Sequence, residues 1–137
     1  MMAKTLHIAI LGVTGYTGFE MLRWACQHPH ITVSALTSQQ HVKKSLQQVF
    51  PHVASLSVVL PELQAHESLA GESLDLIFSC LPHKESHRIL KAYADKTRII
   101  DLSADFRLGS PSTYKHWYDN EHSAPELLAT AVYGLSE

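Results

Sequence analysis

Short apolar runs alternate along the chain with segments in which apolar residues recur at helical spacing. The apolar runs predict strands at residues 6–11, 31–36, 56–60, 74–81 and 97–102. Helical spacing, together with prolines that end two of the segments, predicts helices at residues 18–28, 43–50 and 85–94. Fully apolar strands that alternate with amphipathic helices are typical of a parallel sheet covered on both faces. We therefore expect a doubly wound α/β domain, similar to the Rossmann fold.

The pattern weakens after Asp101, where an aromatic stretch contains Tyr114, Trp117 and Tyr118. We expect these three rings to pack over the sheet. The chain shows no internal repeat, low-complexity run or Gly/Ser linker. It is therefore interpreted as one domain over residues 1–137.

Composition narrows the possible classes of partner. The chain has 137 residues, with 11 Lys and Arg against 13 Asp and Glu, and a formal net charge of −2. This balance argues against a nucleic-acid partner, which a basic patch would attract, and against a polybasic membrane anchor. The sequence also has no apolar run of about 18 residues and no signal-peptide pattern.

The cysteines and histidines form no ligand pattern. Cys26 and Cys80 are far apart, and the 10 histidines are scattered without HExxH or HxH spacing. We therefore expect reduced thiols, a cytoplasmic location and no metal site.

A glycine-rich segment, Gly12-Val13-Thr14-Gly15-Tyr16-Thr17-Gly18, joins the first predicted strand to the first predicted helix. A turn of this kind directs backbone N–H groups and the helix dipole at one point, which suits a pyrophosphate. The GxxGxxG spacing differs from the GxGxxG of many dehydrogenases, and a simple connecting turn is the alternative. Its place at the first βα turn favours dinucleotide binding. The predicted coenzyme-binding residues are Gly12, Thr14, Gly15, Tyr16, Thr17 and Gly18.

The end of the second strand predicts which dinucleotide binds. NAD sites often place Asp or Glu there to accept from the ribose 2′-hydroxyl. This chain has Thr37-Ser38-Gln39-Gln40 and no carboxylate, which favours NADP with Ser38 at the 2′-phosphate. Lys43 and Lys44 are the nearest cations, and they fit a phosphate-binding role and a solvated helix face about equally well.

Four blocks together resemble one family. The segment from Gly12 to Arg23 resembles the opening of N-acetyl-gamma-glutamyl-phosphate reductases, and three further blocks follow in the family's order. They are Leu81-Pro82-His83, the DLSADFRL segment at residues 101–108 and the AVYGL segment at residues 131–135. The resemblance covers essentially the whole chain.

The resemblance implies NADPH-dependent reduction of an acyl phosphate to an aldehyde in arginine biosynthesis. In this chemistry a cysteine thiolate forms a thioester, hydride transfer gives the semialdehyde, and a histidine assists proton transfer. The family's catalytic cysteine follows the Tyr-Gly-Leu block, and this sequence ends before it. We therefore expect part of a longer two-domain enzyme that forms homo-oligomers. We expect the substrate and dimerisation domain to be missing from this chain, and no catalytic residue in it apart from Cys80 as a less favoured candidate. Ser136 replaces a usual proline, and Gln39 stands where an arginine often follows the serine.

Several residues near the resemblance blocks have alternative interpretations. Cys80 ends the fourth predicted strand, and a nucleophilic role for it is less favoured than lining the coenzyme pocket with Leu81, Pro82 and Ser103. Cys26 is expected to be a buried thiol. Asp101, Asp105 and Arg107 fit a structural role, in capping or ion pairing, and a role in forming the pocket about equally well. A role in proton transfer is less favoured.

Two other functions remain open from the sequence. One is a nucleotide-binding module without chemistry of its own. The other is the related aminoadipyl-phosphate or aspartyl-phosphate reduction, which shares the loop type and the mechanism.

Overall fold

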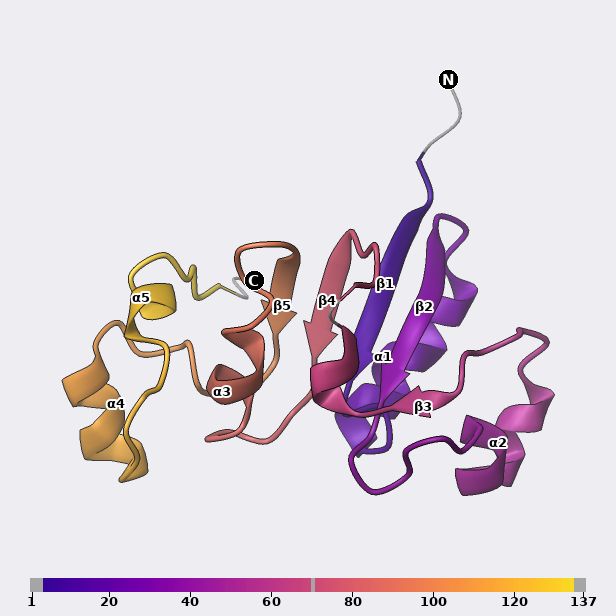
Figure 1. Cartoon of the computed structure of the whole chain (residues 1–137), viewed down its shortest axis with the longest axis horizontal. Coiled ribbons are helices and arrows are strands. Elements are labelled where there is room, and N and C mark those ends of the chain that lie inside the picture. Colours follow the sequence, from indigo (N-terminus) through magenta and orange to yellow (C-terminus); the bar gives the residue numbers. More distant parts are fainter. Residues whose placement is uncertain (1–3, 70, 135–137) are drawn as a thin grey trace.

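A parallel sheet of five strands forms the centre of the computed structural model, which describes residues 4–69 and 71–134 (Figure 1). The strand order is β3-β2-β1-β4-β5 and every neighbouring pair is parallel. The predicted doubly wound fold is therefore confirmed. The strands are β1 (Leu6–Leu11), β2 (Ile31–Thr37), β3 (Leu63–Gln64), β4 (Leu76–Ser79) and β5 (Arg98–Asp101).

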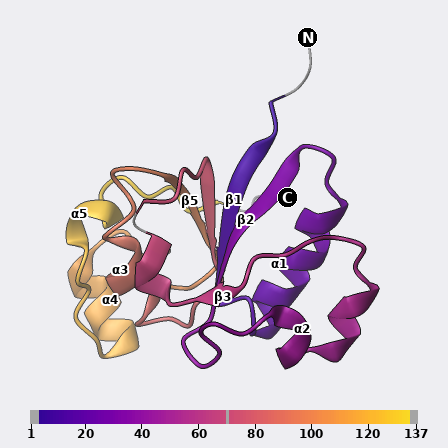
Figure 2. The same cartoon turned by 45° about the vertical axis from the view of Figure 1, so that its right-hand side comes forward.

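Helices cover both faces of the sheet. In Figure 2 the helices α1 and α2 lie on one side of the strands, and α3, α4 and α5 lie on the other. Two short 3-10 turns, η1 and η2, complete the connections. The bounds are α1 (Tyr16–Gln27), α2 (Leu46–Val49), η1 (Pro51–Ser55), η2 (His66–Leu69), α3 (Ser86–Leu90), α4 (Pro111–Tyr118) and α5 (Pro125–Leu128).

The central strand β1 supplies apolar side chains to both layers of the core. Ile8 and Ile10 are fully buried in a cluster with residues of α1 and α2, whereas Ala9 and Leu11 join a second cluster that includes Leu90. Alternate residues of a strand face opposite sides of a sheet, so one strand anchors both layers. This burial fixes the end of β1, and therefore the turn that follows it.

The predicted strand at residues 56–60 is wrong. This segment is irregular, with Val58 and Val59 exposed, and the third strand is the two-residue β3 further along the chain. The apolar run LSVVL matches a strand in composition, but it has no neighbouring strand to pair with. Leu63 and Gln64 pair with the end of β2 instead.

The predicted helices are present with changed bounds. Helix α2 is shorter than predicted because Lys43 adopts a left-handed backbone, with φ of 66°, and Ser45 and Gln48 form a capping box. Helix α3 ends at Leu90 and continues as turns. The aromatic stretch forms α4, which the sequence analysis did not predict. Within it Tyr114 is buried and Trp117 is exposed, so the expectation that all three rings cover the sheet is wrong.

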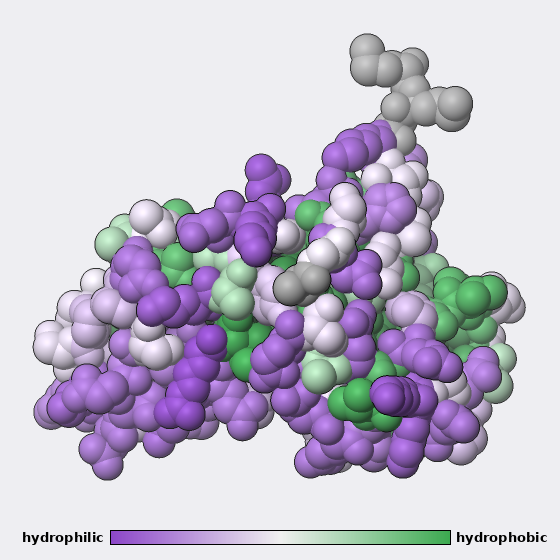
Figure 3. Space-filling view, viewed as in Figure 1, coloured by the Kyte–Doolittle hydropathy of each residue, from purple (hydrophilic) through white to green (hydrophobic). Residues whose placement is uncertain are grey.

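Within the residues that the structure describes, no helix combines the length and the apolar character needed to cross a membrane. The surface seen in Figure 3 is mainly polar, and its apolar areas form separate small patches.

Candidate functional site

The first glycine of the loop ends β1 in a conformation that side chains rarely adopt. Gly12 has a φ of +75°, and a β-carbon added to it would lie 2.9 Å from the carbonyl oxygen of Cys80. The backbone of Val13 donates to the carbonyl oxygen of Thr37 at 3.1 Å. The loop is therefore packed against the ends of both β4 and β2.

The other two glycines of the motif have different roles. A β-carbon on Gly18 would lie 2.2 Å from the carbonyl oxygen of Gly12 and 2.7 Å from the Cα of Val13, so close packing of α1 on the loop requires glycine there. A β-carbon on Gly15 would meet only the Gly12 carbonyl oxygen, at an ordinary 3.6 Å. The fold of the free protein therefore leaves room beside Gly15. This is the space that an approaching phosphate would need.

The N-terminus of α1 is arranged to face an anion. Its N-cap residue is Gly15, which has no side chain to accept from the first turn, and that turn carries no acidic residue. Free N–H groups and the positive end of the helix dipole together favour a negatively charged ligand. Tyr16, the first residue of α1, is fully exposed beside them.

These groups meet at the carboxyl ends of the parallel strands. The chain crosses to opposite faces of the sheet after β1 and after β4, and ligands of open α/β sheets bind at such a switch point. In Figure 3 the lower outline of the molecule is indented at this edge. Cys80 and Leu81 of this turn lie beside Gly12, with Leu81 buried there, whereas Pro82 is exposed.

Ser38 lies at the same edge. The hydroxyl groups of Thr14 and Ser38 are 3.0 Å apart, which joins the glycine loop to the turn after β2. Ser103 follows β5 instead, and no hydrogen bond among the described residues joins it to the glycine loop. The structure therefore brings the predicted coenzyme-binding residues of the first two turns together and leaves Ser103 with a different group of partners.

His66 and Glu67, which were not predicted as site residues, lie against the turn after β2. The Oγ1 of Thr37 lies 2.6 Å from Nδ1 of His66 and accepts from the backbone N–H of Gly12 at 3.3 Å. The side chain of Gln39 spans the backbone of His66 and the carboxylate of Glu67. Both partners belong to η2, which follows β3. Because the third strand was predicted too early in the chain, these partners were not expected here.

The environment of Cys80 does not favour a nucleophile. Burial and the nearby charge of Asp101 raise the pKa of the Cys80 thiol to about 11, so it is protonated at neutral pH. Among the described residues, no hydrogen bond joins this thiol to a histidine. Its backbone, packed against Gly12, is the part that shapes the site.

Asp101 is held in a chain of hydroxyl groups. It accepts from the hydroxyl of Ser86 at 2.7 Å and from that of Ser103 at 2.6 Å, and Ser86 lies 2.8 Å from Ser79. These contacts join β4, α3 and β5. Arg107 pairs with no carboxylate among the described residues, contrary to one alternative, and donates to the backbone carbonyls of Ser103 and Leu102.

Asp105 is fully buried at the start of α3. It accepts from the backbone N–H groups of Lys84 and His87, at 2.8 and 3.0 Å, and from the phenol of Tyr114 at 2.7 Å. These three donors account for its burial without any role in proton transfer. Burial and the bond to Asp105 raise the pKa of Tyr114.

Two stacked histidines lie beside this carboxylate. The rings of His87 and His122 are 4.5 Å apart, and burial lowers the pKa of each. Backbone N–H groups donate to Nδ1 of both rings, from Ser123 at 3.1 Å and from Ala124 at 3.2 Å. An Nδ1 that accepts carries no proton, so both imidazoles are neutral.

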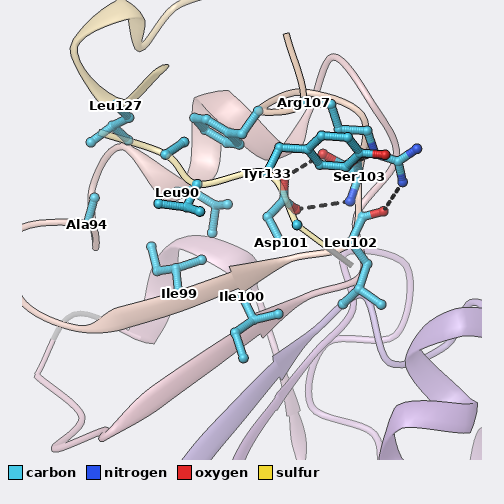
Figure 4. Close-up of a pocket in the computed structure, with 14 residues that line it drawn as sticks. Leu90, Ala94, Ile99, Ile100, Asp101, Leu102, Ser103, Arg107, Leu127 and Tyr133 are labelled. Carbon is cyan, nitrogen blue, oxygen red and sulfur yellow. Dashed lines mark hydrogen bonds between the residues drawn. The ribbon is translucent and has the colours of Figure 1, made fainter. Parts of the chain in front are cut away.

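A cavity of about 610 Å³ lies on the outer side of β5, away from the glycine loop (Figure 4). Leu90, Ile99 and Leu127 form an apolar part of its wall, and Tyr133 lies over the guanidinium of Arg107. Its lining is mostly apolar and it lacks the exposed helix N-terminus of the glycine loop. The glycine loop is therefore the better candidate for coenzyme binding. Leu135 and Ser136, at the end of the last resemblance block, lie outside the described residues.

Comparison with known proteins shows which family and which fold this chain resembles. The family model described as "Semialdehyde dehydrogenase, NAD binding domain" matches residues 7–137. The chain is also similar to proteins named N-acetyl-gamma-glutamyl-phosphate reductase. The one from Ruegeria pomeroyi is 44% identical over 133 residues, which cover 97% of this chain and 38% of that protein. The one from Rhodospirillum rubrum is 40% identical over 141 residues, which cover 99% of this chain and 40% of that protein.

A solved structure shares the fold. It is the crystal structure of aspartate semialdehyde dehydrogenase with NADP from Candida albicans, with a TM-score of 0.64 and 20% identity over 79% of this chain and 32% of that one. The chain thus spans 38% to 40% of the length of the two curated relatives described above.

Proposed function

The chain belongs to the semialdehyde dehydrogenase family, in the part that the family model describes as the NAD-binding domain, and from this premise we propose that it forms the NADP-binding part of an N-acetyl-gamma-glutamyl-phosphate reductase. Such an enzyme reduces N-acetyl-glutamyl 5-phosphate to the 5-semialdehyde. The names of the curated relatives support this substrate over aminoadipyl or aspartyl phosphates.

The observation that carries the proposal is the space at Gly15. Gly12 and Gly18 are required by packing within the protein, but a β-carbon at Gly15 would fit the free chain. What distinguishes Gly15 from other glycines with free space is its place at the N-terminus of α1, where the open space and the helix dipole together favour a pyrophosphate.

In this proposal the chain's own residues bind and orient the coenzyme. The backbone of Gly12, Thr14 and Gly15 and the first turn of α1, with Tyr16, Thr17 and Gly18, would hold the pyrophosphate. Ser38, tied to Thr14, would meet the 2′-phosphate, and Cys80, Leu81, Pro82 and Ser103 would line the pocket toward the nicotinamide. NADPH, when bound, supplies the hydride.

The nucleophile is proposed to lie in the remaining part of the full-length enzyme. That part would bring the catalytic cysteine and histidine, which form the thioester and move its proton, and it would mediate homo-oligomer formation. The whole enzyme is proposed to act in the cytoplasm. Free Cys26 and Cys80 are consistent with a reducing compartment.

Titration with NADPH, followed by fluorescence, tests the proposal. We expect binding by the unaltered chain and a loss of at least about tenfold in affinity for Gly15→Val, because its side chain would occupy the space for the phosphates. Gly109→Val is the matched control, since a β-carbon at Gly109 meets no atom within 4 Å. Equal affinity in all three proteins would contradict the glycine-loop assignment, and binding without later activity in the completed enzyme would favour the non-catalytic module.

A further inference from the structure

We propose that Glu67 determines how strongly the site discriminates between NADPH and NADH, by placing a carboxylate beside the turn that receives the ribose 2′-group. This inference rests on the proposed coenzyme-binding function. The sequence around that turn contains no acidic residue, so the carboxylate is brought there only by the fold.

Gln39 determines where this carboxylate lies. Its Oε1 accepts from the backbone N–H of His66 at 3.1 Å, and its Nε2 donates to the Glu67 carboxylate at 3.2 Å. A backbone N–H can only donate and a carboxylate can only accept, so the amide has one possible orientation. Gln39 thereby ties Glu67 to the turn that contains Ser38, whose hydroxyl lies 3.0 Å from that of Thr14 in the glycine loop.

Two further hydrogen bonds hold the backbone around Glu67 in place. The backbone of Ser38 donates to the carbonyl oxygen of Gln64 at 3.0 Å, and the phenol of Tyr93 donates to that of His66 at 2.7 Å. The first bond fixes the segment before η2 against the end of β2, and the second fixes η2 against the turn that follows α3. Glu67 therefore follows a rigid segment, although its own side chain is exposed.

The charge of Glu67 is available to act on a ligand. Arg88 and Lys96 line a small cavity together with Glu67, but within the described ranges neither comes within 4 Å of its carboxylate as an ion pair. His66, the adjacent titratable group, is buried and its pKa is lowered by burial, so it does not supply a positive charge at neutral pH.

A carboxylate at this place acts differently on the two coenzymes. It repels the dianionic 2′-phosphate of NADPH, and it has no such effect on the neutral 2′-hydroxyl of NADH. Glu67 thus limits the preference for NADPH that the hydroxyl of Ser38 would otherwise allow. Because both groups lie near solvent, the repulsion weakens as salt is added.

The experiment measures dissociation constants for NADPH and NADH with the unaltered chain, Glu67→Gln and Glu67→Lys. We expect Glu67→Gln to raise the NADPH-over-NADH affinity ratio about threefold to tenfold at low salt, with a larger rise for Glu67→Lys. The effect should shrink at about 1 M salt, where the screening length is about 3 Å.

Glu72→Gln is the control, because it removes the same charge from an exposed residue. Glu72 lies shortly before the amino end of β4, whereas the proposed site lies at the carboxyl ends of the strands. An unchanged ratio in Glu67→Gln, with both coenzymes still bound, would overturn this inference and leave the proposed function standing. An equal rise in Glu72→Gln would also overturn it, by showing an effect of net charge alone. If the unaltered chain binds neither coenzyme, both the proposed function and this inference fail.

Discussion

Removing one buried hydroxyl group tests whether Asp105 organises the region after β5. In Tyr114→Phe, Asp105 loses its 2.7 Å bond from the phenol and keeps the two backbone donors from Lys84 and His87. Hydrogen bonds to charged groups contribute about 1.5–3 kcal/mol, and both residues are fully buried. We therefore expect the free energy of unfolding to fall by about 2 kcal/mol, a large part of the 5–15 kcal/mol typical of a domain.

Urea denaturation followed by circular dichroism measures this loss. With a urea dependence of about 2 kcal/mol/M, the midpoint should fall by about 1 M. Tyr118→Phe is the matched control, because it removes a phenol hydroxyl from a neighbouring ring. That hydroxyl forms no hydrogen bond with any described residue. In an Asp105→Asn background, Tyr114→Phe should cost at least about 1 kcal/mol less, because the acceptor is neutral. Equal midpoints for the two Tyr→Phe variants would refute the reasoning.

Three further outcomes are expected. Burial lowers the pKa of His87 and His122, so as the pH falls below about 6.5 the unfolded chain binds protons that the folded chain excludes. Urea midpoints should therefore decrease between pH 7.5 and 5.5. Each histidine can lower the free energy of unfolding by up to about 1.4 kcal/mol per pH unit. Gly18→Ala should destabilise the chain by about 2 kcal/mol or more in urea, whereas Gly109→Ala should not, because only the first places a β-carbon against backbone atoms. The chain alone should not reduce NADP with N-acetyl-glutamate semialdehyde and phosphate, and turnover that disappears in Cys80→Ser would contradict the interpretation of that thiol.

The elements with continuous buried faces could be predicted from the sequence. Residues 8–11 are apolar because this part of β1 is covered on both faces, and Gly18 is required by contact with the nearby backbone of Gly12 and Val13, so both signals are local. The first helix was predicted for the same reason, since Leu22 and Ala25 lie on its buried side.

The features that depend on distant pairing could not be predicted in the same way. Two residues of β3 form a strand only because β2 lies beside them, whereas the more apolar residues 56–60 have no such neighbour. The position of Glu67 could not be predicted because it depends on where β3 pairs with β2. Helix α4 has a local sequence signal, the N-cap Ser110 followed by Pro111, but its aromatic residues were interpreted as packing and not as a helix.

In the part of the chain that the structure describes, strand β5 has a hydrogen-bonded neighbour on one side only, β4, and Ile100 and Leu102 near this edge are 46% and 40% exposed. Unpaired backbone groups beside apolar side chains are a template for another strand, so in concentrated solution two copies of the chain can join edge to edge. Only the exposed Arg98 places a charged side chain toward solvent on this short strand. The amount of chain that stays monomeric during purification will therefore depend on this edge more than on the glycine loop, and a lysine in place of Ile100 should extend the concentration range in which it remains so.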